Sequence, residues 1–397
     1  MITTAIYPEA LICLIIAVFT ALTTLWLQLR PALNVYKNTS RQNKAPLPTS
    51  LPPVSVIVYT SCASSKLSSL LELLMTQDYP GEYEVIVVNE GEDPLTDDVL
   101  LLAESRWHNL RHTFTPAGTR NLSPRKLALT LGIKAAHYDI IVHTTTDATP
   151  DSKKWLAHMA APFINQKIEL AIGVSSVCEP KTTGIRGANR SHYCLFDNTV
   201  ILNAAINGTA FSGDANNLAY RRDLFFRHNG FSESLDIFYG DDDVFVSVSA
   251  TKDNVTAVAA TDSIVSINGD DTSFYYRNLR LKRAFTADYL KRTPRFMFNL
   301  SILTLYIWLI ATVATVVFAP LWMWGIVGNV AIALALWTPM YFIWNRMAKA
   351  LKSRPFYIGL PIFLFTLPLR KLYYRLRCKA VHRAQISWQS TKQTTKR

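Results

Sequence analysis

The chain has 397 residues, of which 49% are hydrophobic and 18% charged, and its formal net charge is +12. The apolar residues are gathered into a few long blocks, which indicates membrane-spanning segments rather than a wholly soluble protein. A basic chain can bind nucleic acid, but no recognition helix or aromatic RNA platform accompanies the charge, so we expect no nucleic-acid partner. Five cysteines without C-x-x-C spacing argue against a zinc site or a disulfide framework.

The first apolar block lies near the N-terminus. No charge lies between Glu9 and Arg30, and residues 10–29 are long enough to cross the roughly 30 Å hydrocarbon core as one helix. We therefore predict a transmembrane helix over residues 1–30. A signal peptide is the alternative, but it would carry positive charge before the apolar run and small residues at a cleavage site after it. Residues 31–53, basic and then Pro-rich, are predicted as a linker.

Residues 54–295 are of ordinary size for one domain and alternate short apolar strands with helices. Such alternation predicts an α/β fold with a mostly parallel sheet and helices on both faces. Ligands of these sheets bind at the carboxyl ends of the strands, so polar residues that follow each strand are the first candidates for chemistry. The predicted strands are 54–59, 83–88 and 139–144, and the predicted helices are 67–75 and 127–136.

Polar residues follow each of these strands. Thr60 follows the first and Glu90 the second, although turn formation alone would also favour such residues. Lys126 begins the next helix and could pair with a phosphate. Asp147 follows the third strand, where a carboxylate can hold a divalent cation that bridges a diphosphate. Capping of the following turn is the alternative for Asp147.

Two later segments also mix features of a binding site. Residues 211–222 combine small and polar residues, including Asn217, and small residues let the backbone approach a ligand closely. Gly240 is followed by Asp241, Asp242 and Asp243 ahead of an apolar helix. The helix dipole favours Asp in the first turn of a helix. Three adjacent carboxylates repel one another, however, and this is unfavourable unless a bound ligand or cation compensates their charge. We therefore interpret this cluster as functional.

The last apolar block, residues 296–345, holds no charge and has Pro320 near its middle, which predicts a transmembrane helical hairpin. Residues 346–397 are predicted to form an interfacial segment and a basic cytoplasmic tail, because 355–369 is short for a span and contains three prolines. Lys and Arg cluster next to the spans on the side of the middle domain and the tail. Short basic loops stay in the cytoplasm, so we expect a multi-pass inner (cell) membrane protein with a cytoplasmic catalytic domain facing anionic membrane lipids.

Taken in order, these segments resemble the family 2 glycosyltransferases, and most closely the membrane-associated members of bacterial envelope polysaccharide pathways. The resemblance covers roughly residues 50 to 290 and depends on the order and spacing of the segments rather than on any single motif. The segments are 54–58, 85–91, 126–136, Asp147 with Pro150 and Trp155, 217–221 and 240–243.

The resemblance implies a GT-A fold, which is a Rossmann-like fold, and a nucleotide-sugar donor. It implies that Thr60 and Glu90 hold the nucleoside, that Asn217 and Asp241 contact substrate, and that Asp242 is the catalytic base. Asp147 corresponds to the last carboxylate of an Asp-x-Asp metal signature, with Thr145 and Thr146 in the other positions. A divalent cation, Mg²⁺ or Mn²⁺, is therefore implied, although Thr145 replaces the first Asp.

Processive members of that family carry Gln-x-x-Arg-Trp ahead of the membrane hairpin. The matching stretch here begins at Arg280 and includes Arg283, without the Gln or the Trp. These two arginines would neutralise a diphosphate, or form a basic collar at the membrane surface. The sequence predicts a membrane-bound inverting glycosyltransferase acting on a lipid-linked or polysaccharide (glycan) acceptor. The alternative is a degenerate, non-catalytic glycosyltransferase that serves as a scaffold in an envelope polysaccharide assembly complex.

Overall fold

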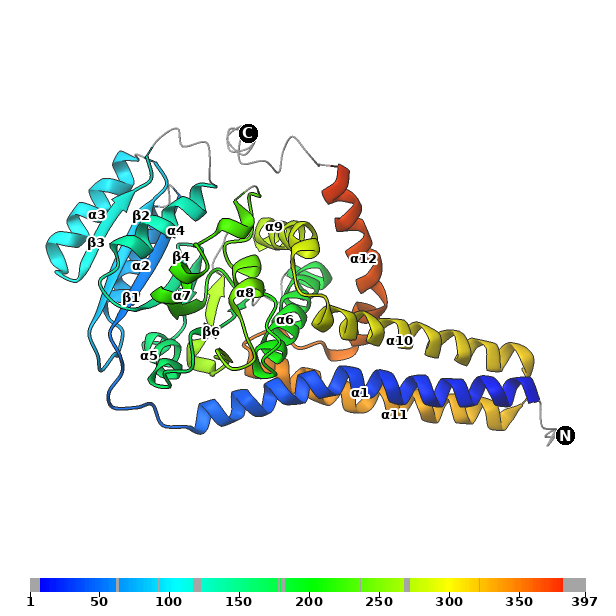
Figure 1. The fold of residues 1–397 in the computed structure, drawn as a ribbon. Coiled ribbons are helices and arrows are strands. Elements are labelled where there is room, and N and C mark those ends of the chain that lie inside the picture. The colour runs from blue at the N-terminus through cyan, green and yellow to red at the C-terminus, as the bar shows by residue number, and fades with distance from the viewer. Residues whose placement is uncertain are drawn as a thin grey trace.

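The computed structural model contains an α/β domain and a bundle of long helices that extends away from it on one side (Figure 1). The structure describes residues 8–61, 64–91, 93–116, 123–177, 179, 183–235, 237–267, 272–320 and 322–380.

The main sheet has seven strands, and most of its neighbouring strands run parallel. Its order is β3-β2-β1-β4-β8-β6-β9, in which β8 is antiparallel to both of its neighbours. The predicted α/β fold with a mostly parallel sheet is confirmed. The strands are β1 (Val54–Thr60), β2 (Tyr83–Asn89), β3 (Leu110–Phe114), β4 (Ile140–Thr145), β6 (Leu170–Ile172), β8 (Leu218–Arg221) and β9 (Val255–Ala257).

The side chains of the central strands are almost all buried, as expected for a sheet covered on both faces. One covering helix, α4, approaches unusually closely. A Cβ at Gly132 would lie 2.7 Å from Ile57 and 3.1 Å from Val88, so the missing side chain lets α4 sit directly on β1 and β2. The helices of the domain are α2 (Ser64–Met75), α3 (Pro94–Arg106), α4 (Pro124–Ala135), α5 (Trp155–Ala160), α6 (Gly184–Ile206), α7 (Arg222–Arg227), α8 (Asp243–Ser249) and α9 (Thr272–Phe285).

A second, three-stranded sheet lies beside the first. It consists of β5 (Ala148–Pro150), β10 (Val265–Ile267) and β7 (Ser175–Ser176), in the order β5-β10-β7. Two residues, Thr146 and Asp147, separate the end of β4 from the start of β5, so the turn between these strands places Asp147 between the two sheets.

Three helices in the described part of the chain are long and apolar enough to cross a membrane. They are α1 (Pro8–Lys44), α10 (Thr293–Phe318) and α11 (Met323–Ala350), and they lie side by side in Figure 1. Helix α1 continues beyond the predicted span into the predicted linker, with Pro31 inside it. The break between α10 and α11 falls at Pro320, where a hairpin turn was predicted.

Polar side chains join α1 to α10 inside this bundle. The Thr24 hydroxyl donates to the hydroxyl of Thr304 (2.8 Å), and the Gln28 amide donates to the hydroxyl of Ser301 (2.9 Å). All four residues are buried. Hydrogen bonds of this kind satisfy polar groups in an apolar bundle and hold neighbouring helices in register.

The last described helix, α12 (Leu360–Ala380), leaves the bundle and runs crosswise to it (Figure 1). A short 3-10 turn, η6 (Tyr357–Gly359), precedes it. Leu369, Leu372, Tyr373 and Leu376 are all more than half exposed and recur at helical spacing, so they form one apolar stripe.

Candidate active site

A cavity of about 520 Å³ opens beside the carboxyl ends of β1 and β4, where the parallel-sheet rule places a ligand. Of the site residues predicted from the sequence, four line this cavity: Asp147, Asp241, Asp242 and Arg283. Five are not among the described residues of its walls: Thr60, Glu90, Lys126, Asn217 and Arg280.

Asp242 lies at the centre of the cavity's charged wall. The preceding Gly240 has a φ of 110°, a conformation that suits glycine, and it turns the chain so that Asp242 caps helix α8. The Asp242 carboxylate accepts hydrogen bonds from the backbone N–H of Asp243 (2.6 Å) and of Ala215 (2.9 Å). The ammonium of Lys282 lies 2.5 Å from the same carboxylate. The side chain is therefore fixed from three directions.

The two adjacent carboxyls of the turn differ in their protonation behaviour. Burial favours the neutral form of Asp242, but Lys282, Arg283 and Arg125 outweigh it and hold its pKa well below the usual range. Burial and the charge of Asp242 raise the pKa of Asp243 to about 6. Asp243 is completely buried and accepts hydrogen bonds from Thr286 (2.5 Å) and the N–H of Val244. Asp242 is thus ionised at neutral pH.

Asp241 forms the neighbouring part of the wall. Its carboxylate makes an ion pair with Arg125 of α4 at 2.7 Å, and it is only 5% exposed. The Arg125 guanidinium also lies over the Tyr59 ring, 5.4 Å from the ring centre, and donates to the carbonyl of Ala215. Burial alone would lower the pKa of Arg125, but Asp241 and Asp242 raise it, so the group stays charged.

Arg283 connects α9 to three other segments. Its guanidinium pairs with Asp197 of α6 at 3.0 Å and lies 3.6 Å from Asp243. It also donates to the hydroxyl of Ser212 and the carbonyl of Gly213. Arg283, which the sequence predicted as a diphosphate contact, therefore lies inside the site, and the neighbouring Lys282 lies there too.

Asp147 lies on the opposite side of the cavity and is the least buried of its carboxylates. Its side chain is 67% exposed, and the nearest cation is Lys66 of α2, at 3.9 Å. Thr145 does not face a ligand position, because its hydroxyl donates to the amide oxygen of Asn216 (2.8 Å). Among the described residues, no cluster of three or more His, Cys, Asp or Glu side chains suits a metal ion. Asp147 could therefore offer one carboxylate to a cation whose other ligands are diphosphate and water, as Mg²⁺ sites often do.

Lys126 does not point into the cavity, contrary to the expected phosphate contact. It is completely buried, and its ammonium donates to the carbonyl oxygens of Ser234 and Ile237. These bonds support the segment that leads into the turn of Asp241, Asp242 and Asp243. Arg125, one residue earlier on α4, faces the cavity instead, because adjacent residues of a helix point about 100° apart.

Thr60 and Glu90 lie behind the cavity wall. Thr60 is fully buried at the end of β1, and its hydroxyl has no hydrogen-bond partner among the described residues. Glu90 accepts a hydrogen bond from the hydroxyl of Tyr59, and Tyr59 itself lines the cavity. Burial and Glu90 both raise the pKa of Tyr59, so the hydroxyl keeps its proton. Glu90 therefore contacts the cavity only indirectly, through its hydrogen bond with Tyr59.

Asn217 connects three buried segments rather than facing a ligand. Its amide oxygen accepts from the indole N–H of Trp155 (3.0 Å), and its amide nitrogen donates to the carbonyls of Val174 (3.0 Å) and Ser263 (2.8 Å). Its amide atoms lie 2.5 to 2.8 Å from the position of a Cβ on Gly173, so a larger residue there would collide with it.

Arg280 is buried among aromatic rings one turn before Arg283. Its guanidinium lies 4.0 Å from the ring centre of Tyr193 and 4.7 Å from that of Tyr374. Tyr374 belongs to α12, so this stacking joins α9 to the crosswise helix. Arg280 and Arg283 also line a second cavity, of about 360 Å³, between α6, α9, α10 and α12.

Sequence reasoning missed most of the described residues that line the main cavity, among them Tyr59, Lys66, Arg125 and Lys282. Three of these four stand directly beside predicted residues: Tyr59 next to Thr60, Arg125 next to Lys126 and Lys282 next to Arg283. A run of two basic residues was the available signal, but the sequence does not show which member of each pair faces the strand ends.

The cavity at the strand ends holds a buried ionised carboxylate and several cations that are fixed by ion pairs, an arrangement that suits an enzyme of group transfer. The sequence comparison gives the particular class, because the profile of glycosyl transferase family 21 matches residues 10–396. The chain belongs to this family. The predicted enzyme class, a glycosyltransferase, is confirmed, and the family is family 21 rather than family 2. No curated protein matches the sequence at a significant level.

Several solved glycosyltransferases show a weak similarity. A mannosyltransferase from Pyrobaculum calidifontis, solved with GDP-Man and Mn²⁺, is 17% identical with a TM-score of 0.49, and the match covers 90% of this chain and 99% of that chain. Glucosyl-3-phosphoglycerate synthase from Mycobacterium tuberculosis, solved with Mn²⁺, UDP-glucose and phosphoglyceric acid, is 13% identical with a TM-score of 0.41, covering 60% and 79%. Similarity at this level carries no inference about the substrate of this chain.

The contacts of Asn217 predict a structural effect for the Asn217→Ala substitution. The change leaves the buried Trp155 indole N–H and the Ser263 carbonyl without this partner and removes one of the two hydrogen bonds that the Val174 carbonyl accepts. An unpaired buried polar group costs about 1–3 kcal/mol, so we expect the free energy of unfolding to fall by about 2 kcal/mol or more. Thermal unfolding of the detergent-purified protein measures this. Asn278→Ala, at a cavity-lining Asn on α9, is the matched control and should leave stability nearly unchanged. An unchanged melting temperature with a raised KM for the donor would restore Asn217 as a substrate contact.

Proposed function

We propose that the chain is a membrane-embedded inverting glycosyltransferase that moves a sugar from a nucleotide-sugar to a lipid-linked or glycan acceptor. The observation that carries this proposal is Asp242, a buried carboxylate that is ionised and faces the cavity at the strand ends. An inverting transfer needs a carboxylate that takes the proton of the acceptor hydroxyl as its oxygen attacks the anomeric carbon. The bond to the nucleoside diphosphate breaks in the same step, and the leaving group carries away the electron pair.

The cations of the cavity suit the leaving diphosphate. Lys282 and Arg283 lie beside Asp242, and Lys66 lies across the cavity beside Asp147. Positive groups placed where negative charge develops stabilise a transition state. Of the substrate-binding residues predicted from the sequence, the proposal keeps Asp241 and Arg283 in contact with the donor. It places Thr60 and Glu90 behind Tyr59, and it gives Lys126, Asn217 and Arg280 supporting contacts.

The state of Asp242 also suggests how its basicity is controlled. A carboxylate paired with Lys282 is ionised but weakly basic, because the ammonium holds its pKa low. A bound diphosphate competes for the same ammonium. When Lys282 turns toward the diphosphate, Asp242 loses its strongest counter-charge and its proton affinity rises. Donor binding would thus prepare the base for the acceptor.

A divalent cation is compatible with this site on the strength of Asp147. The cation would be held by this one carboxylate together with the donor's phosphates, and it would supply positive charge to the leaving group. The chain's own contribution there is Lys66, whose ammonium already lies 3.9 Å from Asp147.

Membrane embedding and a lipid-linked acceptor are supported by two further features. The exposed stripe of α12, defined above, would lie in the interface with its apolar side toward lipid, as amphipathic helices do. The second cavity shares Asp197 and Arg283 with the first and has apolar walls that include Phe196, Phe298 and Leu367. An acceptor with an apolar tail could therefore reach Asp242 from the side of the membrane helices.

Replacement of Asp242 by Asn separates a catalyst from a scaffold. We expect Asp242→Asn to keep donor binding and lose about 10² to 10⁴ in the rate of transfer, because an amide cannot accept the acceptor's proton. A radiolabelled sugar-transfer assay on membranes measures the rate, and calorimetric titration with UDP- and GDP-sugars measures binding. Asp241→Asn controls for loss of charge and should be milder. Parental activity in the Asp242 variant would favour the non-catalytic scaffold.

The exposed position of Asp147 predicts a functional effect without a structural one. Asp147→Ala should abolish turnover while the melting temperature stays within error, since among the described residues the exposed side chain makes one long ion pair, with Lys66. The assay is run across a titration of Mn²⁺ and Mg²⁺, with the exposed Asp139→Ala as the control. Full turnover in Asp147→Ala would show that Lys66, Lys282 and Arg283 neutralise the diphosphate without a metal.

The asymmetry of Lys and Arg about the spans predicts the topology. Reporter fusions after Lys44, at Pro320 and after Ala380 should read cytoplasmic, external and cytoplasmic, respectively. The reporter pair is one enzyme that is active only outside the cytoplasm and one fluorescent protein that folds only inside it. An external signal from the first or the last fusion would contradict the proposed orientation.

A further inference from the structure

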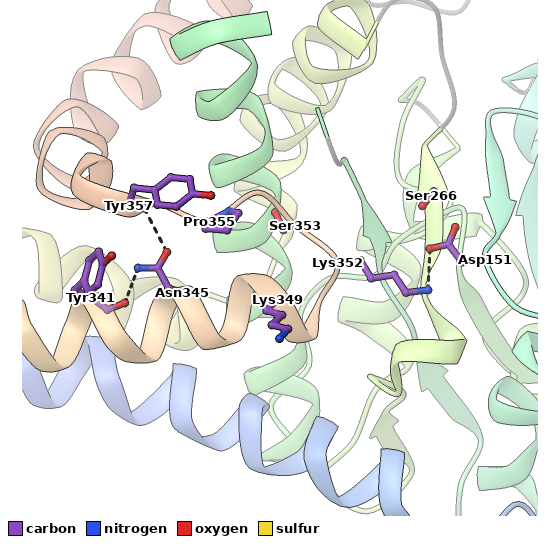
Figure 2. Close-up of a pocket in the computed structure, with 9 residues that line it drawn as sticks. All are labelled: Asp151, Ser266, Tyr341, Asn345, Lys349, Lys352, Ser353, Pro355 and Tyr357. Atoms are coloured by element: carbon purple, nitrogen blue, oxygen red, sulfur yellow. Dashed lines mark hydrogen bonds and ion pairs between the residues drawn. The ribbon is translucent and has the colours of Figure 1, made fainter. Parts of the chain in front are cut away.

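A hollow of about 590 Å³ lies where α11 ends and the chain turns toward α12 (Figure 2), and no described residue of its walls also lines the main cavity. One wall is the end of α11, another is the segment that leads into η6, and the third belongs to the second sheet. The wall residues that matter here are Tyr341, Asn345, Lys349, Lys352, Asp151 and Tyr357.

The position of the hollow along α11 corresponds to the surface of a bilayer. About 20 helical residues cross the hydrocarbon core, so a span that begins near Met323 leaves it close to Tyr341. Lys349 lies two turns further along the helix. Tyr341 and Tyr357 are 39% and 53% exposed, and aromatic residues of this kind gather at the level of the lipid headgroups.

Lys352 occupies a position that normally suits glycine. It has a φ of 49° directly after the end of α11, its N–H donates to the carbonyl of Lys349, and the N–H of Ser353 donates to that of Ala348. This is the Schellman pattern of helix termination, in which the left-handed residue is usually Gly. A lysine there is strained relative to glycine.

The lysine ammonium is held over the hollow by the second sheet. It pairs with Asp151 at 3.0 Å, as Figure 2 shows, and the Lys352 carbonyl accepts a hydrogen bond from Ser176 of β7 (2.6 Å). Asp151 directly follows β5, the strand that begins just after Asp147. Lys352 therefore joins the membrane helix to the sheet beside the catalytic cavity.

The opposite rim of the hollow, around Asn345, is also held by hydrogen bonds. Asn345 donates from its amide to the carbonyl of Tyr341 and accepts from the N–H of Tyr357 (Figure 2). It also accepts from the N–H of Phe356. These bonds hold Tyr357 with a φ of 47°, a conformation that bulky side chains rarely adopt. The hollow thus has a fixed shape in the free protein.

The charges of the hollow favour an anion. Lys349 and Lys352 contribute two positive charges against the single carboxylate of Asp151, and Lys349 is exposed on the helix surface. Basic pockets between membrane helices on the cytoplasmic side bind phosphate-bearing lipid headgroups. We propose that this hollow is a binding site for the phosphate of an anionic glycerophospholipid of the cytoplasmic leaflet. The proposal rests on the membrane embedding given under the proposed function.

A lipid bound there contacts both lysines through its phosphate, and its glycerol and acyl chains run back along α11 beside Tyr341. Because Lys352 also carries the contacts to Asp151 and Ser176, the bound headgroup fixes the second sheet at a set height above the bilayer. That sheet includes the strand next to Asp147, so the site supports the geometry of the donor cavity without taking part in the reaction.

The double variant Lys349→Gln, Lys352→Gln tests the site. The full-length protein is reconstituted into phosphatidylcholine nanodiscs with and without phosphatidylglycerol, extracted gently and examined by native mass spectrometry for retained lipid. We expect the parent to retain phosphatidylglycerol and the variant to bind it at least about tenfold more weakly, since each lysine near a phosphate contributes about one kcal/mol. Inorganic phosphate at millimolar concentration, added to the discs that contain phosphatidylglycerol, should not displace the lipid from the site.

The matched control is the double variant Lys37→Gln, Arg41→Gln, which removes the same amount of charge from two exposed basic residues near the end of α1. Equal lipid loss in the control and the variant would reduce the effect to surface charge and overturn the site, as would equal retention by variant and parent. Lys352→Gly, which keeps the helix ending, separates loss of the lysine from misfolding. Extraction of the chain by alkaline carbonate would instead refute the membrane embedding itself.

Discussion

The burial of adjacent carboxylates in the turn before α8 constrains the rest of the site. Removing an ionised carboxylate from water costs several kcal/mol unless cations and N–H donors surround it. Arg125 arrives from α4, and Lys282 and Arg283 arrive from α9. The turn can therefore keep its shape only when both helices are docked, and the cavity is the space left between them.

This requirement connects the site to the membrane part of the chain. Helix α9 continues through a 3-10 turn, η5 (Thr286–Tyr289), directly into α10. Arg280, on the same helix, stacks against aromatic rings of α6 and α12. The helix that neutralises the carboxylates is thus held on its other side by elements next to the proposed bilayer surface. A shift of α9 relative to α10 would reach Asp242 through Lys282 without any change in the sheet.

The fold was more predictable from the sequence than the roles of single residues. The strands that begin at Val54 and Tyr83 were recognisable because buried parallel strands are continuous apolar runs. The cluster from Asp241 to Asp243 stood out because repulsion among its carboxylates needs an explanation, and the family resemblance then singled out Asp242. The short strands β6, β8 and β9 have three or four residues each and carry no comparable pattern. The direction in which a helical side chain points depends on how the helix docks in the fold. The sequence alone therefore could not show that Arg125, rather than Lys126, lines the cavity.

Asn217 shows a second limit, because a polar residue in a small-residue segment can serve a ligand or a buried network. Thr145 is another polar residue that serves a buried network, and its position bears on the chemistry of the site. Where the family 2 pattern places a first metal carboxylate, the Thr145 hydroxyl holds Asn216, and the neighbouring Ala215 donates its N–H to Asp242. A carboxylate at position 145 would accept rather than donate, and it would repel the oxygen of Asn216. The exchange of Asp for Thr therefore removes a potential metal ligand and at the same time supports the loop that orients the proposed base.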